Sequence, residues 1–206
     1  GVHEETITVE VADEQIAEIS ETLEVAPIEM PRPPVSVFAW SYVGDTVSYA
    51  PGFTDLDAMA EDLEVHFVDA PWAHPGVLDF PAEGSIDAEG HITEPLDWSE
   101  LDRWIARFPD ARTYCVFASM NHDLRYGLED YSPRWKTAMG EWFESLQTHL
   151  EETGVDPSRV AILIVDEPHS EAQERKIIEV GRIMEAAAPD IRVFEDPVRP
   201  DPTEAL

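Results

Sequence analysis

Residues 160–168 read VAILIVDEP: six apolar residues in succession, then two acids and a proline. A strand with one solvated face alternates apolar and polar residues, whereas a strand covered on both faces is apolar at every position. The unbroken apolar run is therefore typical of a parallel strand buried between two layers. It predicts an α/β fold in which the acid pair stands at the carboxyl end of a central strand.

The segments on either side of this run alternate between strand-like and helix-like patterns. Helix-like segments carry apolar residues three and four positions apart, as Trp135, Met139 and Trp142 do. Strands separated by helices form parallel βαβ units. The predicted strands cover residues 35–43, 65–68, 113–118, 160–165 and 191–194. The predicted helix starts are Thr54, Asp97 with Glu100, Ser132 with Pro133, and Ser170 with Gln173, and the longest helix should stop at Gly154.

Two architectures fit this alternation, an open doubly wound sheet and a (β/α)8 TIM-type barrel. No predicted strand is followed by a glycine-rich phosphate loop, so the nucleotide-binding version of the open sheet lacks support. Long, aromatic-rich segments after the strands favour a barrel, whose sites are built from such loops. A complete barrel takes ~250 residues, so residues 35–206 should form only its N-terminal part, with about five strands. The remainder of the barrel or a partner chain should then cover the open strand edges.

Residues 1–34 have a different character. Residues 6–11 alternate polar and apolar side chains, a second extended run covers residues 21–28, and MPRPP at residues 30–34 is a stiff proline-rich connector. Thirty-four residues are too few to bury a core of their own. They read as the tail of a β domain and its linker, and the first residues look like a cut end.

The composition excludes several classes of protein. The 206 residues carry 44 acidic and 13 basic side chains, a net charge of -31, which would repel nucleic acid and anionic membranes. No apolar run reaches ~18 residues, so no membrane-inserted segment is expected. A single cysteine, Cys115, rules out a disulfide framework, and a buried thiol is expected. Only two lysines stand against 11 arginines, which fits either a salt-loving source or an ordinary acidic secreted or cell-surface protein.

The acid pair Asp166 and Glu167 is the strongest candidate for catalysis. Adjacent strand residues normally face opposite sides of the sheet. At the end of a strand, before a proline, this alternation can break, so both carboxylates can reach the opening at the carboxyl end of the barrel. Two acids at one mouth suit glycoside hydrolysis, because one can protonate the leaving oxygen while the other stabilises the attacking group. The alternative is that both acids solvate the strand end or cap the next helix, although Ser170 already supplies that cap.

The chain resembles glycoside hydrolase family 123 and the related domain-of-unknown-function 4091 proteins. The resemblance rests on residues 22–34, on DAEGHITEPLDWSELD at residues 87–102, and on VDEP at residues 165–168. It implies the end of a β-sandwich before a barrel, and cleavage of β-linked N-acetylhexosaminides, of the N-acetylgalactosaminide type, by a substrate-assisted retaining mechanism. By this resemblance Asp166 orients the 2-acetamido group and Glu167 is the general acid/base. The chain stops after the fifth strand, before the rest of the family's barrel.

Further residues after the predicted strands could bind a sugar by stacking or hydrogen bonding. They are Trp40 and Tyr42 after the first strand, Asp69, Trp72 and His74 after the second, and Asn121 and His122 after the third. Each could instead be a core or loop residue. No histidines have metal-ligand spacing, so neither a metal nor a cofactor is expected. A non-catalytic carbohydrate-binding or structural barrel module remains the alternative function.

Overall fold

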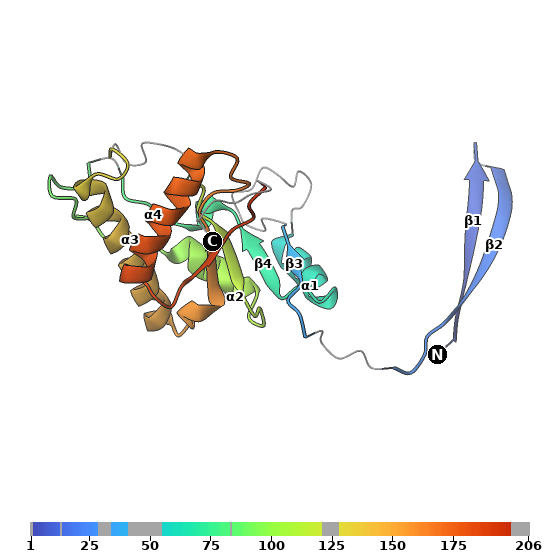
Figure 1. The fold of residues 1–206 in the computed structure, drawn as a ribbon. Helices are drawn as coiled ribbons and strands as arrows, with labels where there is room; N and C mark the ends of the chain where they lie inside the picture. The colour runs from blue at the N-terminus through green and yellow to red at the C-terminus, as the bar shows by residue number, and fades with distance from the viewer. Residues whose placement is uncertain are drawn as a thin grey trace. The chain divides into compact units, whose positions relative to one another are not determined.

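The computed structural model describes residues 2–12, 14–28, 34–40, 55–82, 84–120 and 128–198. Its contacts divide the chain into two compact units, residues 1–34 and residues 35–206 (Figure 1). The division falls at the proline-rich segment of the sequence. Each unit is described by itself.

The first unit is an antiparallel hairpin of β1 (Val2–Val11) and β2 (Glu14–Glu24). Ile7 pairs with Ile19, and both side chains are about half exposed, so the hairpin has little core of its own. The predicted strand at residues 6–11 lies within β1. The second run was placed too late, because the turn at Ala12, with φ of 52°, starts β2 at Glu14.

The second unit contains a five-stranded parallel sheet in the order β3-β4-β5-β6-β7. The strands are β3 (Phe38–Ala39), β4 (Ala70–Ala73), β5 (Tyr114–Phe117), β6 (Val160–Leu163) and β7 (Arg192–Phe194). Each strand pairs with the strands that precede and follow it in sequence. A doubly wound sheet reverses its strand order partway across, whereas this order does not. The predicted α/β class with parallel strands is confirmed, and the winding is consistent with part of an α/β barrel.

Four α-helices among the described residues connect or flank the strands. They are α1 (Leu56–Val65), α2 (Ser99–Arg107), α3 (Pro133–Thr153) and α4 (Glu171–Ala187), with single 3-10 turns η1 (Pro75–Val77) and η3 (Pro157–Arg159). The Ser132 hydroxyl accepts a hydrogen bond from the N–H of Trp135, and Ser170 does the same for Gln173. Gly154, with φ of 79°, ends α3 in the left-handed region. These predicted starts and this stop are confirmed. None of the helices in the described ranges is long and apolar enough to cross a lipid bilayer.

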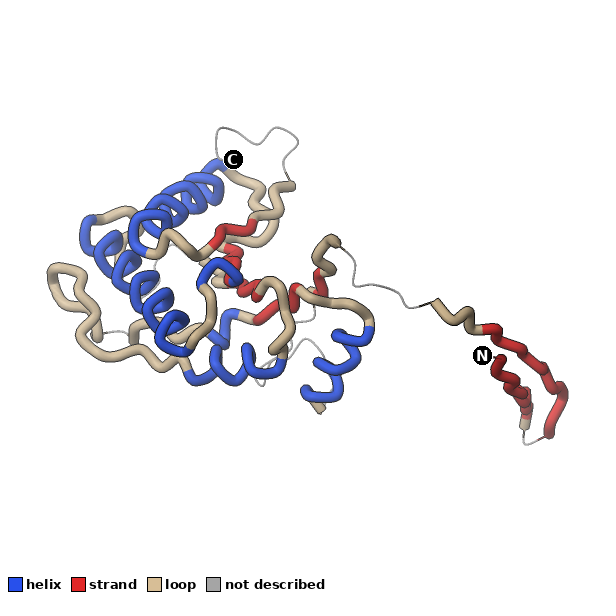
Figure 2. The backbone as a smooth tube through the Cα atoms, turned by 90° about the horizontal axis from the view of Figure 1, so that it is seen from below, coloured by secondary structure: helices blue, strands red, loops and turns tan. Residues whose placement is uncertain are grey.

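The two faces of the sheet are buried to different extents. On one face Val116 and Ile162 join a large core with the helices, which gather around the strands in Figure 2. The largest fully buried helix residues in that core are Leu101, Trp104, Trp142, Phe143, Leu146 and Leu150. On the other face the buried cluster is small, comprising Ala70, Trp72, Cys115, Ala161 and Leu163, with Phe117 and Phe194 packed against it. We call this second surface the inner face.

Two of the predicted strands have wrong boundaries. Residues 65–68 are not a strand: Val65 ends α1, Phe67 turns with φ of 65°, and the strand starts at Ala70. The sequence did not predict a strand here because it contains Pro71, and proline has no backbone N–H to donate to a neighbouring strand. The first strand is limited to Phe38–Ala39 among the described residues.

Of the predicted helix starts, Asp97 does not cap its helix and Thr54 is not described. The α2 helix begins at Ser99 after Trp98, and the Asp97 carboxylate accepts a hydrogen bond from the Ser99 N–H before the helix. The predicted capping box at Asp97 is therefore wrong. Thr54 lies outside the described residues, and Asp55 caps α1 by accepting from the Ala58 N–H at 3.0 Å.

Candidate active site

The acid pair lies just beyond the carboxyl end of β6. Ile164 and Val165 remain fully buried after the strand, Asp166 is half-buried, Glu167 is exposed, and Pro168 is buried. Glu167 has φ of 46°, in the left-handed region that is unfavourable by about 1 kcal/mol for a residue with a side chain. This turn breaks the strand alternation, and the charge of Glu167 is close enough to contribute to raising the pKa of Asp166.

Two further acids, Glu195 and Asp196, follow the neighbouring strand β7. The Asp196 carboxylate accepts a hydrogen bond from the backbone N–H of Glu167 at 3.1 Å. The negative charge of Asp196 also helps to raise the pKa of Asp166. Four acids from the ends of two adjacent strands therefore share one edge of the sheet.

Glu195 binds the backbone just ahead of the acid pair. Its Oε1 atom accepts a hydrogen bond from the Ile164 N–H at 3.2 Å. The Oε2 atom is buried and has no hydrogen-bond partner among the described residues. Glu195 thus supports the segment that carries Asp166.

The shared edge changes the acidity of two carboxyl groups. Burial raises the pKa of Asp166, and the negative charges of Asp196 and Glu167 raise it further, while His169 opposes the effect. Burial raises the pKa of Glu195 to about 8, against the effect of its hydrogen bond with the Ile164 backbone. At neutral pH Glu195 is therefore largely protonated. A cluster of this kind can hold protons where acid–base chemistry needs them.

Sequence reasoning missed Glu195 and Asp196, although a signal was present. Residues 165–168 read VDEP and residues 194–197 read FEDP, so each of the last two strands ends in an apolar residue, two acids and a proline. Because carboxyl ends of adjacent parallel strands meet at one edge, two such endings predict a shared cluster.

The aromatic candidates belong to the inner face. The Trp40 and Trp72 rings stack with centroids 4.2 Å apart and planes 14° apart, and Phe194 meets Trp72 edge-on at 5.1 Å. Trp72 lies within β4 and is only 1% exposed, so its predicted position after the strand is wrong and it is a core residue. Trp40 is 43% exposed and follows β3, which leaves part of its ring accessible to a ligand.

Asp69 does not lie at the carboxyl edge of the sheet, where it was predicted. Asp69 precedes β4 rather than following the strand, at the opposite edge of the sheet, and it is fully buried. It accepts a hydrogen bond from the Val37 N–H at 2.8 Å and forms an ion pair with Arg112 at 3.0 Å. These contacts join the amino ends of neighbouring strands, so Asp69 is a structural residue.

The other predicted binding residues divide into described and undescribed positions. His74 follows β4 at the same edge as the acid pair, where its Nδ1 accepts from the Gly76 N–H at 3.2 Å and burial lowers its pKa. Tyr42, Asn121 and His122 lie outside the described residues. Cys115 is buried on the inner face, and burial raises the pKa of its thiol to about 12, so it is a poor nucleophile at neutral pH. The described residues include no group of three or more His, Cys, Asp or Glu side chains that could hold a metal ion.

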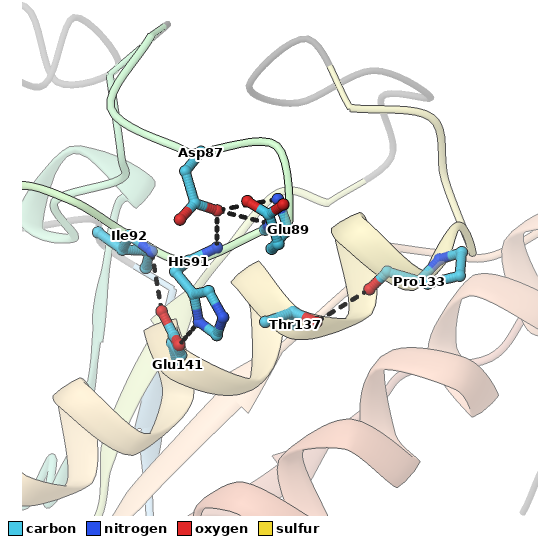
Figure 3. A network of polar contacts seen from close by, with 8 residues as sticks. Asp87, Glu89, His91, Ile92, Pro133, Thr137 and Glu141 are labelled. Atoms are coloured by element: carbon cyan, nitrogen blue, oxygen red, sulfur yellow. Dashed lines mark hydrogen bonds and ion pairs between the residues drawn. The ribbon is translucent and has the colours of Figure 1, made fainter.

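The segment at residues 87–102 consists of a loop, residues 87–98, and the first turn of α2, and the loop packs against α3 (Figure 3). The Asp87 carboxylate accepts hydrogen bonds from the N–H groups of Glu89, Gly90 and His91. Glu141 on α3 contacts the His91 ring at 2.6 Å and accepts from the Ile92 N–H at 2.8 Å. The Asp87 and Glu141 carboxylates therefore hold this loop in place.

The fold and its acids define a parallel α/β protein with an acidic site at the carboxyl edge of the sheet. No protein-family model and no curated protein matches the chain. Among solved structures it is similar to an endoglucanase, with 13% identity and a TM-score of 0.47, over 79% of this chain and 51% of that one. It is also similar to the Clostridial cellulose synthase subunit Z from Clostridioides difficile, with 10% identity and a TM-score of 0.43, over 68% of this chain and 44% of that one. The chain spans about half the length of these structures.

Proposed function

We propose that the chain carries the acid pair of a glycoside hydrolase that cleaves β-linked N-acetylhexosaminides, of the N-acetylgalactosaminide type. The observation that carries the proposal is the placement of Asp166 and Glu167 in adjacent positions at the carboxyl edge, with Glu167 in a left-handed turn. Glycosidases with an enzyme nucleophile place their two carboxyl groups on either side of the bond. An adjacent pair suits a reaction in which the substrate supplies its own nucleophile.

In this mechanism each acid has one task. Glu167 donates its proton to the glycosidic oxygen as the bond between that oxygen and the anomeric carbon breaks. The carbonyl oxygen of the 2-acetamido group forms the new bond to the anomeric carbon, giving an oxazolinium ion. Asp166 accepts the acetamido N–H and offsets the positive charge. Water then attacks the anomeric carbon, the bond from that carbon to the acetamido oxygen breaks, and a proton of the water passes to Glu167, so the configuration is retained.

The proposal extends to the surroundings of the site. The second unit would be the N-terminal part of a (β/α)8 barrel, and the remainder of that barrel or a partner chain would cover the inner face and the edges of β3 and β7. The consecutive strand order and the partly exposed Phe38 and Trp40 support this arrangement. The hairpin of the first unit would be the end of a β-sandwich. A secreted or cell-surface location fits the acidic composition.

Substitution of the general acid tests the proposal. In the complete protein, Glu167→Gln should lower kcat on 4-nitrophenyl N-acetyl-β-galactosaminide by at least ~10²-fold, because the leaving oxygen loses its proton donor. Glu185→Gln changes an exposed acid on α4 and should leave kcat unchanged. A thiazoline analogue of the oxazolinium ion should inhibit the wild type. Full activity of Glu167→Gln would refute the assignment.

A second candidate is a carbohydrate-binding module without catalysis, which the exposed, stacked ring of Trp40 favours. An aromatic ring supported by a second ring is a rigid platform for a sugar face. Calorimetry with N-acetylgalactosamine, beside the hydrolysis assay, separates the two functions. Binding that is lost in Trp40→Ala, with no turnover by the wild type, would establish the second function.

A further inference from the structure

The alternation of side chains along β6 breaks just before the acid pair. Leu163 belongs to the cluster on the inner face and Ile164 to the core with the helices, as alternation requires. Val165 joins the same core as Ile164, whereas strict alternation would turn it to the inner face. The chain therefore leaves the regular path of the strand at Ile164, and the contacts of that residue decide the direction in which Asp166 follows.

Hydrogen bonds hold the backbone of Ile164 from both sides. Its carbonyl oxygen accepts from the N–H of Met120, in the segment after β5, at 2.8 Å. Its own N–H donates to the Oε1 atom of Glu195, after β7, at 3.2 Å. The backbone pairing of β6 with β7 ends at Leu163 and Phe194. The Glu195 side chain therefore supplies an acceptor at the point where the β7 backbone has stopped pairing.

We propose that Glu195 is a positioning residue for the acid pair, because its side chain extends the pairing of β7 with β6 by one hydrogen bond and fixes the segment that carries Asp166 and Glu167. The proposal rests on the proposed function and deepens it, since that function assigns tasks only to Asp166 and Glu167. Glu195 acts through the backbone of Ile164 and not on the substrate itself.

Burial makes this hydrogen bond hard to replace. Ile164 and Val165 are fully buried, so water cannot take the place of Glu195 as the acceptor for the Ile164 N–H. Without that acceptor the N–H would stay unpaired at a cost, or the segment would shift toward another acceptor. A displacement of about 1 Å in a catalytic group can lower a rate by ~10²-fold. The position of Asp166, two residues later, therefore depends on the Glu195 contact.

Glu195 makes this contact as a neutral group at neutral pH. Its Oε2 atom is buried with no hydrogen-bond partner among the described residues, and a full negative charge would be costly there. The charged groups that act on Glu195 are Asp196 on its own segment and Asp166 at the end of β6, both of them acids. Burial, and then these charges, raise the pKa of Glu195 to about 8. Glu195 thus holds the segment without placing another negative charge beside Asp166.

The amide signal of Ile164 reports on the contact without any assay of activity. In the complete protein labelled with ¹⁵N-isoleucine, the variant Ile164→Val identifies that signal. The wild-type signal should shift in a step at about pH 8, as Glu195 ionises, and Glu195→Gln should abolish the step. Glu185→Gln changes an exposed acid on α4 and should leave the step in place. The absence of any step that depends on Glu195 would overturn the proposal.

Two variants of Glu195 separate the hydrogen bond from the charge. Glu195→Gln keeps an oxygen acceptor, so hydrogen exchange of the Ile164 amide should stay slow. Glu195→Leu fills a similar volume without an acceptor, and exchange should become at least ~10-fold faster. The pKa of Asp166, which burial raises, should also fall in Glu195→Leu as its segment opens to water. Unchanged exchange together with an unchanged Asp166 midpoint would overturn the proposal. Glu195→Asp, one methylene shorter, gives the same test if Glu195→Leu does not fold.

Kinetics connect the contact with the proposed reaction. In the complete protein, Glu195→Leu should lower kcat on 4-nitrophenyl N-acetyl-β-galactosaminide by ~10²-fold, because the acid pair is displaced. KM should change much less, since Glu195 makes no contact with the sugar in the proposed mechanism. Glu195→Gln should recover most of the kcat that Glu195→Leu loses, because the acceptor for Ile164 is restored. A wild-type kcat in Glu195→Leu would overturn the positioning role.

The two sets of measurements distinguish failure of this inference from failure of the proposed function. If the Ile164 signal and the Asp166 midpoint respond to Glu195 as expected but the wild type hydrolyses no substrate, the glycosidase is refuted and the positioning of the acid pair by Glu195 stands. If the wild type hydrolyses the substrate but neither NMR signal responds to Glu195, only the positioning role is refuted.

Discussion

The Oε1 atom of Glu195 lies 3.2 Å from the backbone nitrogen of Ile164, one residue beyond the last paired residues of β6 and β7. The side chain thus continues the ladder of the sheet after the backbone of β7 has ended its pairing. Its second oxygen is buried with no partner among the described residues. A protonated carboxyl group suits this position better than a charged one.

Glu195→Gln should therefore change how stability depends on pH. Burial raises the pKa of Glu195 from 4.5 to about 8 in the folded protein, so the folded state binds this proton more tightly than the unfolded chain. The resulting stabilisation is complete below the unfolded pKa and is lost as the pH rises through about 8. Urea unfolding at pH 5, 7 and 9 should show the variant gaining stability relative to wild type as the pH rises. Parallel curves for the two proteins would contradict this, and Glu185→Gln serves as the control.

The buried ion pair of Lys176 and Asp130 should be costly to break. Their side chains are 6% and 11% exposed, and the Lys176 ammonium also lies over the rings of Tyr131 and Trp135 at 5.4 Å. Lys176→Met leaves the Asp130 charge uncompensated and should reduce the free energy of unfolding by about 3 kcal/mol.

A double-mutant cycle checks the cause of that loss. Adding Asp130→Asn to Lys176→Met should recover part of the stability, because the unpaired charge is removed. The matched control is Lys136→Met, since Lys136 pairs with Glu179 at 3.0 Å but remains 46% exposed. That variant should lose less than about 1 kcal/mol. Equal losses for the two lysines would contradict the prediction.

Gly90 should be far less tolerant of alanine than Gly84. Both have positive φ, 102° and 93° respectively, but a Cβ at position 90 would lie 2.4 Å from the Arg134 carbonyl oxygen, and one at position 84 would meet nothing within 4 Å. Gly84→Ala should lose about 1 kcal/mol from backbone conformation alone. Gly90→Ala should lose at least about 2 kcal/mol more, from the overlap with backbone. Thermal unfolding of both variants measures the difference, and equal melting temperatures would count against the packing shown for this loop.

The contact between His91 and Glu141 should be visible in the titration of the imidazole. The hydrogen bond that the Glu141 carboxylate accepts from the His91 ring, and then the negative charge of Glu141, raise the pKa of His91 above its ordinary value. Stability from this contact is therefore present below the ordinary pKa and lost as the pH rises through the folded one. In Glu141→Gln the NMR midpoint of His91 should move down. An unmoved His91 midpoint would show that the loop is held in another way.

The sequence predicts most of the sheet, because a central strand that is buried on both faces needs an apolar side chain at every position. The run at residues 160–165 is apolar on both faces, and the structure buries all six residues. The second strand was misplaced because Pro71 resembles a strand breaker, and because Val65 and Val68 resemble strand residues although Val65 completes a helical turn. Its true position depends on pairing with Phe38 and Cys115, which are remote in sequence.

The candidate site was predicted only in part for a similar reason. Asp166 and Glu167 stand out because they interrupt an apolar run. Glu195 and Asp196 follow a short strand of three residues, with a weaker pattern, and their importance comes from the neighbouring strand. Their contacts with Ile164 and Glu167 join residues about thirty positions apart. Composition and local spacing do not specify such contacts, whereas the order of strands does.

That strand order also bears on how the protein is made. Each described strand after β3 lies beside the strand translated immediately before it, so none of these strands has to insert between two that are already paired. As the chain leaves the ribosome, the sheet can grow at one free edge, a helical crossover at a time. The acid site would then be assembled late: Asp166 and Glu167 emerge first, and they acquire their hydrogen-bonded neighbours only when β7 has docked.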